Sequence, residues 1–527
     1  MAPRARRLAV ATAAAAAEAE AADAPAAAAA AEPQEAKPRR RTRRSSTDKP
    51  PAADGAAATT KPQQPRPARR TAAAAPQGAG GATAAAAAPP RRPPGGAAAP
   101  RRKKRAAAAP PPAAPAGPKP APLGGRLAPF YSSGANMPTW QKGRRAGVIL
   151  HPTSLPGGLG VGDLGPEALA FVDWLRGAGM TLWQVLPLVP PDPEFFSPYS
   201  GLDANCGNPL LVSCDALATE GLLAPEDVAA ARAELAAAAA ASAAAPVPAA
   251  GGAPASSMPA SASAVDFAAV AAAKGPLLAK AARALLSGPR FQALRDLGFR
   301  RWRKANPWVE DSALFDCLRR TPELLGKAWW EWPEDLRFRR EGALAEARLR
   351  HRREMDEFVA VQFFFDRQWA ALKAYANSRG VGIVGDMPIY VGGMSADVWA
   401  NPSLFELDRK TLAPAAVSGV PPDAFSGTGQ LWGSPLYRWP AHAKQGYAWW
   451  ASRMARHMQL FDETRVDHFR AFAGYWSVGA GAETAMGGEW RLGPGKALFD
   501  ALEARLGKVP ILAEDLGVIT TDVVELR

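Results

Sequence analysis

Cysteine is scarce in this sequence, which limits the cross-links and metal sites that it can build. The chain contains only Cys206, Cys214 and Cys317, with no C-x-x-C pair and no cluster of Cys with His. This pattern argues against a disulfide framework and against a structural zinc site, and it fits a reducing compartment. The sequence therefore predicts no metal and three buried thiols that pack as small apolar side chains.

Acidic residues are scarce at the N-terminal end of the chain. Residues 1–125 hold 22 Lys and Arg against 7 Asp and Glu, a net charge of +15, while the whole chain carries +14. Residues 126–527 are therefore close to neutral, near −1. A neutral body gives no electrostatic reason to predict nucleic-acid binding.

Large apolar side chains are also rare in residues 1–142, which consist mainly of Ala, Pro, Gly, Arg and Lys. Such a composition cannot bury enough surface to offset the entropy of ordering, so we predict a disordered tail. Its start has three Arg and no acid before Glu18, which is typical of an organelle transit peptide. Basic runs such as RRRTRR leave a nuclear signal as an alternative. The apolar run near the start is too short and too rich in Ala to span a membrane.

Strands and helices alternate from about Gly143 onward. Residues 146–152 and 181–190 have the pattern of buried strands, and an amphipathic helix is expected between them at 166–179. This β-α-β unit favours a parallel sheet. After residue 355 the alternation resumes with a long helix at 356–380, strands at 381–391, 464–472 and 508–518, a Gly- and Pro-rich loop region at 392–440 and a helix at 444–462.

The α/β domain at 143–527 is interrupted by a segment of different composition. Residues 191–355 contain polar loops and helical stretches rich in Trp and Arg, which predict an inserted, mostly helical subdomain. Within it, residues 229–264 are rich in Ala, Pro and Ser and are predicted to be a flexible low-complexity insert.

The position of three carboxylates distinguishes two possible arrangements of the parallel sheet, an open doubly wound sheet and a closed β/α barrel. Asp386, Asp467 and Glu514 each fall at or near the C-terminal end of a different predicted strand. In β/α barrels, catalytic groups gather at that end. We therefore predict a (β/α)8 TIM-type barrel, of which five strands are present in the sequence.

The segment GVGDLG at 160–165 matches the G-x-G-x-x-G pattern of dinucleotide-binding folds. That fingerprint requires a turn directly after a strand. Here the strand is expected to end near His151, and PTSLPGGL intervenes. We therefore interpret these glycines as shaping a loop rather than binding a nucleotide.

The segment RVDHFRAF at 465–472 places a carboxylate beside an arginine at a strand end. An adjacent cation favours the charged carboxylate, so Asp467 beside Arg465 suits a nucleophile or an electrostatic stabiliser. Apolar neighbours around Glu514 suit a proton donor. Two carboxylates with these different roles can cleave a glycosidic bond. The alternative is structural: Asp467 and Arg465 form an ion pair, and Glu514 caps a helix.

Aromatic residues in three loops favour a saccharide ligand. SPYSGLDANCGNPL, GDMPIYV and GQLWGSPLYRW each place an aromatic side chain among Gly, Pro and polar residues. Sugar rings have apolar faces that stack on Trp and Tyr, whereas core aromatics usually occupy periodic apolar runs.

At these residues the sequence resembles the 4-α-glucanotransferases of glycoside hydrolase family 77, the amylomaltases, and among them the plastid disproportionating enzymes. The motifs that carry the resemblance include GVILHPTSLPG, SPYSGLDANCGNPLL, GDMPIYV, SADVWANP, SGVPPDAFSGTGQLWGSPLY, RVDHFRAF and AEDLGVIT. The resemblance implies a β/α barrel with inserted subdomains. It also implies a retaining double displacement on α-1,4-glucans and malto-oligosaccharides, without a cofactor, in the plastid.

The resemblance also implies roles for individual residues. Asp467 would be the nucleophile, Arg465 its charged partner, and Glu514 the general acid and base. Asp386 would bind sugar hydroxyls near the cleaved bond. The remaining substrate contacts would come from Tyr199, Asp423, Gln430, Trp432 and His468.

Family members carry a third carboxylate in an HDN motif on a later strand, and residues 1–527 do not contain that motif. We therefore expect a C-terminally truncated barrel with exposed sheet edges, low stability and little activity from these residues alone. Two other functions stay open. One is an α-glucan hydrolase with the same carboxylate pair, and the other is a glucan-binding protein without turnover.

Overall fold

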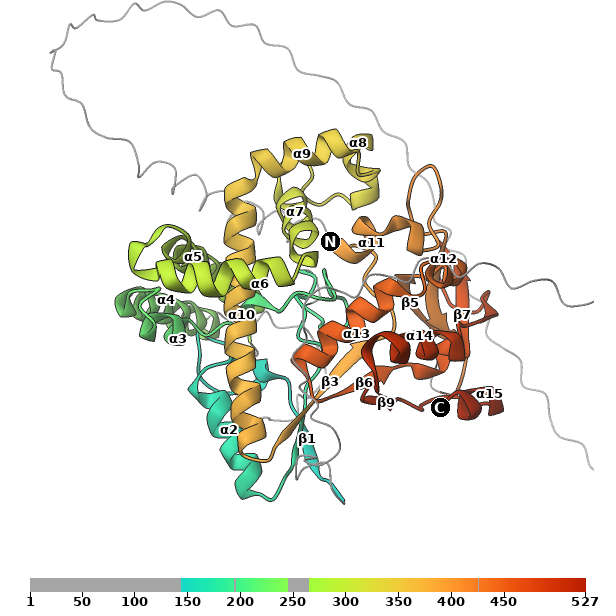
Figure 1. Cartoon of the computed structure of the whole chain (residues 1–527), viewed down its shortest axis with the longest axis horizontal. Coiled ribbons are helices and arrows are strands. Elements are labelled where there is room, and N and C mark those ends of the chain that lie inside the picture. The colour runs from blue at the N-terminus through green and yellow to red at the C-terminus, as the bar shows by residue number, and fades with distance from the viewer. Residues whose placement is uncertain (1–143, 194–195, 245–264, 425) are drawn as a thin grey trace, which may run out of the picture. The chain divides into compact units, whose positions relative to one another are not determined.

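The computed structural model describes residues 144–193, 196–244, 265–424 and 426–527 (Figure 1). The predicted disordered tail with its transit peptide lies outside the described residues. So do residues 245–264, which form the second part of the predicted low-complexity insert.

A five-stranded parallel sheet organises the part of the chain that carries the three carboxylates. Its strand order is β1-β2-β3-β6-β9, and every neighbouring pair is parallel. Parallel strands need crossover connections, which explains why helices separate them in the sequence. The strands are shorter than the sequence predicted: β1 (Gly147–Ile149), β2 (Leu182–Gln184), β3 (Gly382–Pro388), β6 (Glu463–Asp467) and β9 (Ile511–Ala513).

Two helices pack beside this sheet at positions that the sequence predicted. Helix α2 (Pro166–Gly177) begins with a proline, which suits the first helical turn. It buries Ala168, Val172 and Leu175, a spacing that lies along one face of a helix. Helix α10 (Arg352–Ser378) is the long helix that crosses Figure 1, and it is followed by Gly380 in a left-handed conformation.

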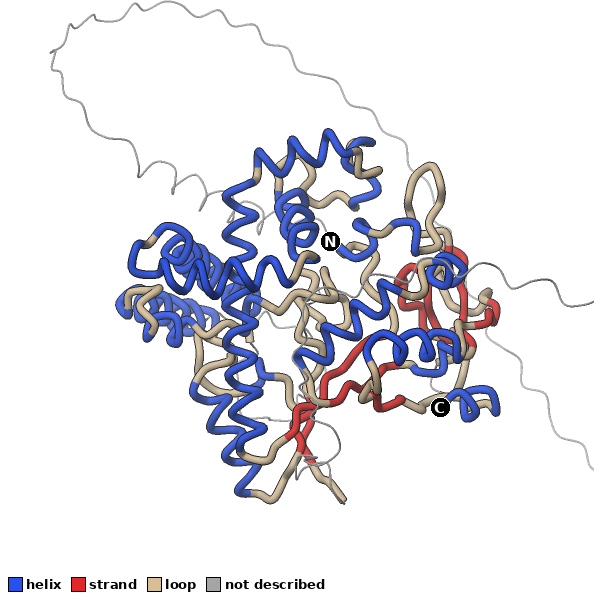
Figure 2. Tube along the Cα trace, in the orientation of Figure 1, coloured by secondary structure: helices blue, strands red, loops and turns tan. Residues whose placement is uncertain are grey.

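The described residues between β2 and α10 are mostly helical (Figure 2). The Ala-rich residues 229–244, which we predicted as part of a low-complexity insert, belong to helix α4. The helices are α3 (Cys214–Thr219), α4 (Pro225–Ala244), α5 (Phe267–Ser287), α6 (Arg300–Ala305), α7 (Trp308–Arg320), α8 (Glu334–Arg337) and α9 (Glu341–Arg350).

Two strands of a second, antiparallel sheet lie where the sequence predicted a loop region. Its strand order is β5-β4-β7-β8, and it includes two strands from residues 392–440. Gly and Pro at these positions indicated loops, but the backbone pairs across strands despite a register shift between Val417 and Gly419. The strands are β4 (Ala416–Val420), β5 (Gln430–Pro435), β7 (Gly474–Gly479) and β8 (Glu489–Leu492).

The remaining helices lie between strands of the two sheets, except for one that follows the last strand. The predicted helix at 444–462 corresponds to α13, which begins directly after Tyr447, whose φ of 56° is left-handed. The bounds are α11 (Ala396–Ala400), α12 (Trp439–Lys444), α13 (Ala448–Leu460), α14 (Lys496–Leu506) and α15 (Thr521–Leu526).

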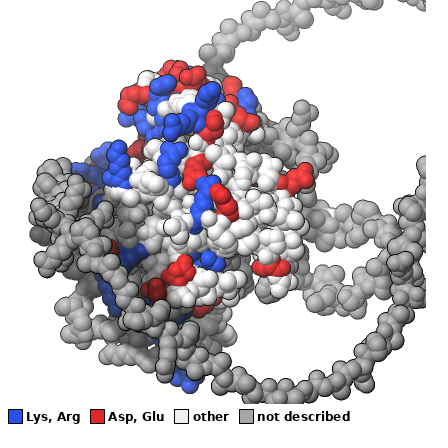
Figure 3. All heavy atoms as spheres, turned by 90° about the vertical axis from the view of Figure 1, so that its right-hand side faces the viewer, with Lys and Arg blue, Asp and Glu red and all other residues white. Residues whose placement is uncertain are grey.

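Burial agrees with one of the sequence predictions. Cys206, Cys214 and Cys317 are free thiols and all are buried, which confirms their predicted packing role. Figure 3 shows one face of the molecule, on which basic side chains lie among acidic ones and large areas are uncharged. Among the described helices, none combines the length and the apolar character that a bilayer crossing requires.

The GVGDLG segment is part of the packed core. The 3₁₀ helix η2 (Pro152–Ser154) separates it from β1, so the turn of a dinucleotide-binding fingerprint is not formed. A Cβ atom on Gly162 would lie 2.2 Å from the Pro152 carbonyl oxygen, which explains the need for glycine. Asp163 accepts a hydrogen bond of 3.0 Å from Lys274 of α5, and this ion pair is almost fully buried.

Removing the cation of that buried pair is expected to destabilise the protein. The Lys274 ammonium also donates to the carbonyls of Leu210 and Val212. Burial raises the pKa of Asp163, and Lys274 opposes that shift. We expect Lys274→Met to lower the free energy of unfolding by about 3–5 kcal/mol at neutral pH.

The loss should be smaller at acidic pH, because a buried Asp163 with a raised pKa is most stable when protonated. Thermal and urea denaturation at pH 5 and pH 8 measure the difference. Lys280→Met is the control, since Lys280 lies on the same helix but forms an exposed ion pair with Asp227. Equal destabilisation by the two substitutions would contradict the stabilising role that we give to the buried Lys274–Asp163 pair.

Candidate active site

Arg465 links two carboxylates at the C-terminal ends of neighbouring strands. Asp386 of β3 pairs in register with Arg465 of β6, and Asp467 lies two residues further along the same face of β6. The guanidinium donates from Nη1 to Asp386 Oδ1 and from Nη2 to Asp467 Oδ1, both at 2.7 Å. One cation therefore fixes the separation of two acids that are 81 positions apart in the sequence.

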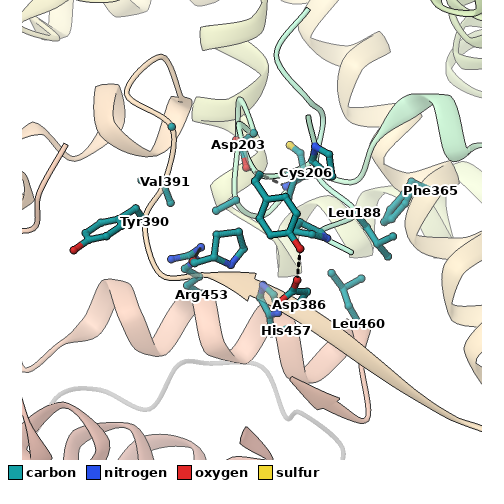
Figure 4. Close-up of a pocket in the computed structure, with 18 residues that line it drawn as sticks. Leu188, Asp203, Cys206, Phe365, Asp386, Tyr390, Val391, Arg453, His457 and Leu460 are labelled. Carbon is teal, nitrogen blue, oxygen red and sulfur yellow. Dashed lines mark hydrogen bonds between the residues drawn. The ribbon is translucent and has the colours of Figure 1, made fainter. Parts of the chain in front are cut away.

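Asp386 is the more buried of these two acids, with an exposed fraction of 1%. Its Oδ2 accepts a hydrogen bond of 2.7 Å from the Tyr199 hydroxyl, drawn as a dashed line in Figure 4. Burial raises the pKa of Asp386, while the bonds from Tyr199 and Arg465 counteract that effect. Tyr199 itself is 41% exposed, so its ring faces solvent beside the carboxylate.

Glu514 lies next to Asp467 across the sheet. Val466 pairs with Ala513, and the Glu514 amide donates to the Val466 carbonyl at 3.2 Å. The Glu514 Oε2 atom accepts a 2.9 Å hydrogen bond from the backbone N–H of His468, the residue after Asp467. The two carboxylates therefore emerge at the same end of adjacent parallel strands.

The surroundings of Glu514 are less apolar than its sequence neighbours suggested. Leu512 is 38% exposed and Leu516 is 73% exposed. Glu514 also accepts a hydrogen bond from the Leu516 amide, so its carboxylate fixes the turn that follows β9. Of the structural alternatives, the Asp467–Arg465 ion pair is present, but Glu514 does not cap a helix: α15 begins only at Thr521, after Thr520.

His468 and Trp432 form one aromatic wall beside the carboxylates. Their ring centroids are 4.8 Å apart and the planes are nearly perpendicular, at 89°. Burial, and then the charge of Arg470, lower the pKa of His468 to about 4, so the imidazole is neutral at pH 7. Trp432 is 41% exposed, which leaves its ring accessible.

The hairpin of β4 and β5 carries the other two predicted contact residues. Gln430 begins β5, and its Oε1 accepts a hydrogen bond of 3.2 Å from the Trp432 indole N–H. Asp423 is exposed in the loop between the strands, where its Oδ1 accepts from the Ser426 amide at 2.8 Å. The structure therefore joins Gln430 to the aromatic wall and places Asp423 in the adjoining loop.

Sequence reasoning missed Arg453 of α13, which supports the end of β3. Its side chain is 3% exposed and donates to the carbonyls of Pro388 at 2.6 Å and Ile389 at 3.0 Å. These residues lie two and three positions after Asp386. In Figure 4, Arg453 and Asp386 line the same small cavity, of about 30 Å³. Nothing in the sequence distinguishes this arginine from the other charged residues of an amphipathic helix.

The site as described brings together acids, one linking cation and aromatic rings. Across the described ranges, no group of three or more His, Cys, Asp or Glu side chains is arranged to hold a metal ion.

Comparison with known proteins places the chain among enzymes of one family. The sequence model described as 4-alpha-glucanotransferase matches residues 150–527. The chloroplastic/amyloplastic 4-alpha-glucanotransferase of Solanum tuberosum is 48% identical over 387 residues, which are 73% of this chain and 62% of that protein. The corresponding Arabidopsis thaliana protein, DPE1, is 47% identical over 75% of this chain and 63% of its own length.

A solved amylomaltase structure also resembles this chain. An amylomaltase from Streptococcus agalactiae in complex with acarbose matches with a TM-score of 0.63 and 35% identity, over 73% of this chain and 71% of that one. The mixture of helices with a parallel sheet is therefore shared with an amylomaltase. The chain spans less than two thirds of the length of the two plant proteins. The match over residues 150–527 shows that the chain belongs to the 4-alpha-glucanotransferase family.

Proposed function

We propose that the whole protein is a 4-α-glucanotransferase that moves segments of α-1,4-glucan between malto-oligosaccharides. The observation that carries this proposal is the placement of Asp467 and Glu514 at the same end of adjacent strands, with Arg465 bonded to Asp467. Family membership and the names of the relatives support it. No cofactor takes part in the reaction that we propose.

Asp467 is the nucleophile in this proposal. Its carboxylate forms a bond to the anomeric carbon as the bond from that carbon to the glycosidic oxygen breaks, and Glu514 donates a proton to the departing oxygen. An acceptor glucan then gives its hydroxyl proton to Glu514 and displaces Asp467. Two inversions at the same carbon restore the α configuration.

The surrounding residues position the sugar. Asp386, held by Arg465 and Tyr199, accepts hydrogen bonds from sugar hydroxyls next to the cleaved bond. Trp432 and His468 supply an aromatic wall against which the apolar face of a sugar can pack. Gln430 and Asp423 contribute further contacts from the β4–β5 hairpin.

We also propose that the five parallel strands belong to a (β/α)8 barrel, with residues 191–355 as an inserted subdomain. The all-parallel order and the intervening helices support this, as does the gathering of acids at the C-terminal strand ends. A plastid location is the corresponding cellular proposal. It rests on the chloroplastic/amyloplastic names of the plant relatives and on the basic, acid-poor start of the sequence.

Incubation of the full-length protein with maltotriose tests the proposed function. A transferase produces glucose and longer oligomers while the number of reducing ends stays constant. A rising number of reducing ends would indicate the hydrolase instead. Binding of maltotriose without any change in chain length would indicate a glucan-binding protein, and either result would overturn the proposal.

A further inference from the structure

Two buried carboxylates lie outside the proposed catalytic group. Asp203, in the loop that follows Tyr199, is 6% exposed, and Asp397 of α11 is 5% exposed. Asp397 belongs to the SADVWANP motif, to which the proposed reaction assigns no role. Buried acids are rare unless they bind a partner, so both require an explanation.

Both carboxylates bond to the backbone of one short segment. Asp397 Oδ2 accepts from the Ala204 amide at 2.8 Å. Asp203 Oδ1 accepts from the amides of Asn205 at 2.8 Å and Cys206 at 3.0 Å. Asp397 therefore bonds residues 203–206 to α11, and Asp203 stabilises the turn that these residues form.

The same segment ends the loop that presents Tyr199 to the active site. Leu202 bonds to Pro190 and to Ala396 through the backbone, at 2.9 Å in each case. On the other side, Arg456 of α13 donates to the Asn205 carbonyl at 2.9 Å. Tyr199 is only four residues before Asp203, and its hydroxyl must reach Asp386 to form the 2.7 Å bond.

A polar cavity of about 230 Å³ adjoins both acids. It has room for several water molecules, which can exchange protons with the two carboxylates. The ionisable groups that face Asp397 come from three elements besides its own: Asp203 and Cys206 of the loop, Asp311 of α7, and Arg453 of α13.

Burial raises the pKa values of both acids. Burial, and then the charge of Asp203, raise the pKa of Asp397 to about 7. Burial also raises the pKa of Asp203. Two desolvated carboxylates that face one cavity repel each other when both are ionised. The protonated pair is therefore stable below neutral pH and is lost as the pH rises through 7.

We propose that Asp397 and Asp203 are positioning residues for glucan binding: they hold residues 203–206, and through them Tyr199, where the Tyr199 hydroxyl bonds to Asp386. This inference rests on the proposed function, because it assigns Tyr199 and Asp386 to the sugar. Neither acid touches the substrate. The two acids affect the affinity for glucan, and this affinity falls when both carboxylates are ionised.

A double-mutant cycle tests the link to Tyr199. In the full-length protein, Asp397→Ala and Tyr199→Phe are each expected to weaken maltoheptaose binding about tenfold, the loss of one hydrogen bond to a charged group. The double variant should bind no more weakly than either single variant, because both changes break the same arrangement. KM should rise while kcat changes less. Additive losses in affinity would overturn the proposal.

Asp397→Asn supplies the second measurement and keeps an acceptor for the Ala204 amide. Calorimetric titration with maltoheptaose at pH 6 and pH 8.5 should show an affinity loss at the higher pH in the unmodified protein and no such loss in Asp397→Asn. Asp311→Asn makes the same chemical change in the same cavity, but Asp311 is bonded to Arg339 and Arg348. It should retain the pH dependence of the unmodified protein.

The two proposals fail in different ways. If the unmodified protein neither binds maltoheptaose nor transfers glucan, the proposed function is wrong whatever the variants do. If it binds and transfers, but Asp397→Asn and Asp311→Asn show the same pH dependence, only the positioning role is wrong.

Discussion

Replacing Asp467 with Asn is expected to abolish glucan transfer while leaving the fold unchanged. The amide has nearly the same shape and can still accept the hydrogen bond that Arg465 donates at 2.7 Å. It cannot form the covalent glycosyl-enzyme, because a neutral amide is a very poor nucleophile. We expect kcat with maltotriose to fall by at least about 10⁴-fold. Circular dichroism and thermal denaturation should match those of the unmodified protein.

Asp467→Ala with added azide tests the assignment through the configuration of the product. With α-maltosyl fluoride as donor, azide can enter the space left by the carboxylate and displace fluoride once, which gives a β-glycosyl azide. If Glu514 were the nucleophile instead, Asp467→Ala would yield the α product. Asp500→Asn, on the exposed face of α14, is the control and should leave turnover unchanged.

The arrangement of the acids could be predicted because parallel strands have a simple geometry. Asp386, Asp467 and Glu514 each follow a short apolar run, and the carboxyl ends of parallel strands meet at one edge of a sheet. Once the strands are identified, the acids must lie together. The spacing of β3 and β6 in the sequence could not reveal that Arg465 would bond to both Asp386 and Asp467, because the register between the strands decides it.

The second sheet could not be predicted from the same patterns. Strand β5 has exposed residues over most of its length and contains Gly433, so it lacks the apolar alternation that marks a strand. Pairing with β4 stabilises it instead. Trp432 owes its place beside His468 to this pairing, so the aromatic loop GQLWGSPLYRW indicated a sugar contact but not its neighbour.

The burial of charged side chains is another feature that could not be predicted from the sequence. Asp397 lies in a segment that we predicted as a loop and Arg453 on the predicted helix at 444–462, yet both are almost fully buried. Their partners are backbone groups: the Ala204 amide for Asp397, and the Pro388 and Ile389 carbonyls for Arg453. Backbone partners have no sequence signature, so only the folded chain reveals them.

Glu514→Gln is expected to slow transfer to an extent that depends on the leaving group. Glutamine cannot donate a proton to the glycosidic oxygen, and the loss of a general acid typically costs about 10²–10⁴-fold. We expect a fall of that size in kcat with maltotriose. With α-maltosyl fluoride the first step should be affected much less, because fluoride departs with little protonation. Comparing the two donors distinguishes the role of Glu514 from that of Asp467, because loss of Asp467 should stop the reaction with both donors.

A purely structural role for Glu514 makes a different prediction. Its carboxylate accepts hydrogen bonds from the amides of His468 and Leu516, and Gln can retain one acceptor for them. If the residue only shaped this turn, both donors would lose activity equally and thermal stability would fall with them. Asp515→Asn, at the neighbouring exposed position, controls for local disturbance of the turn. A loss confined to maltotriose, with unchanged stability, requires that Glu514 transfer the proton.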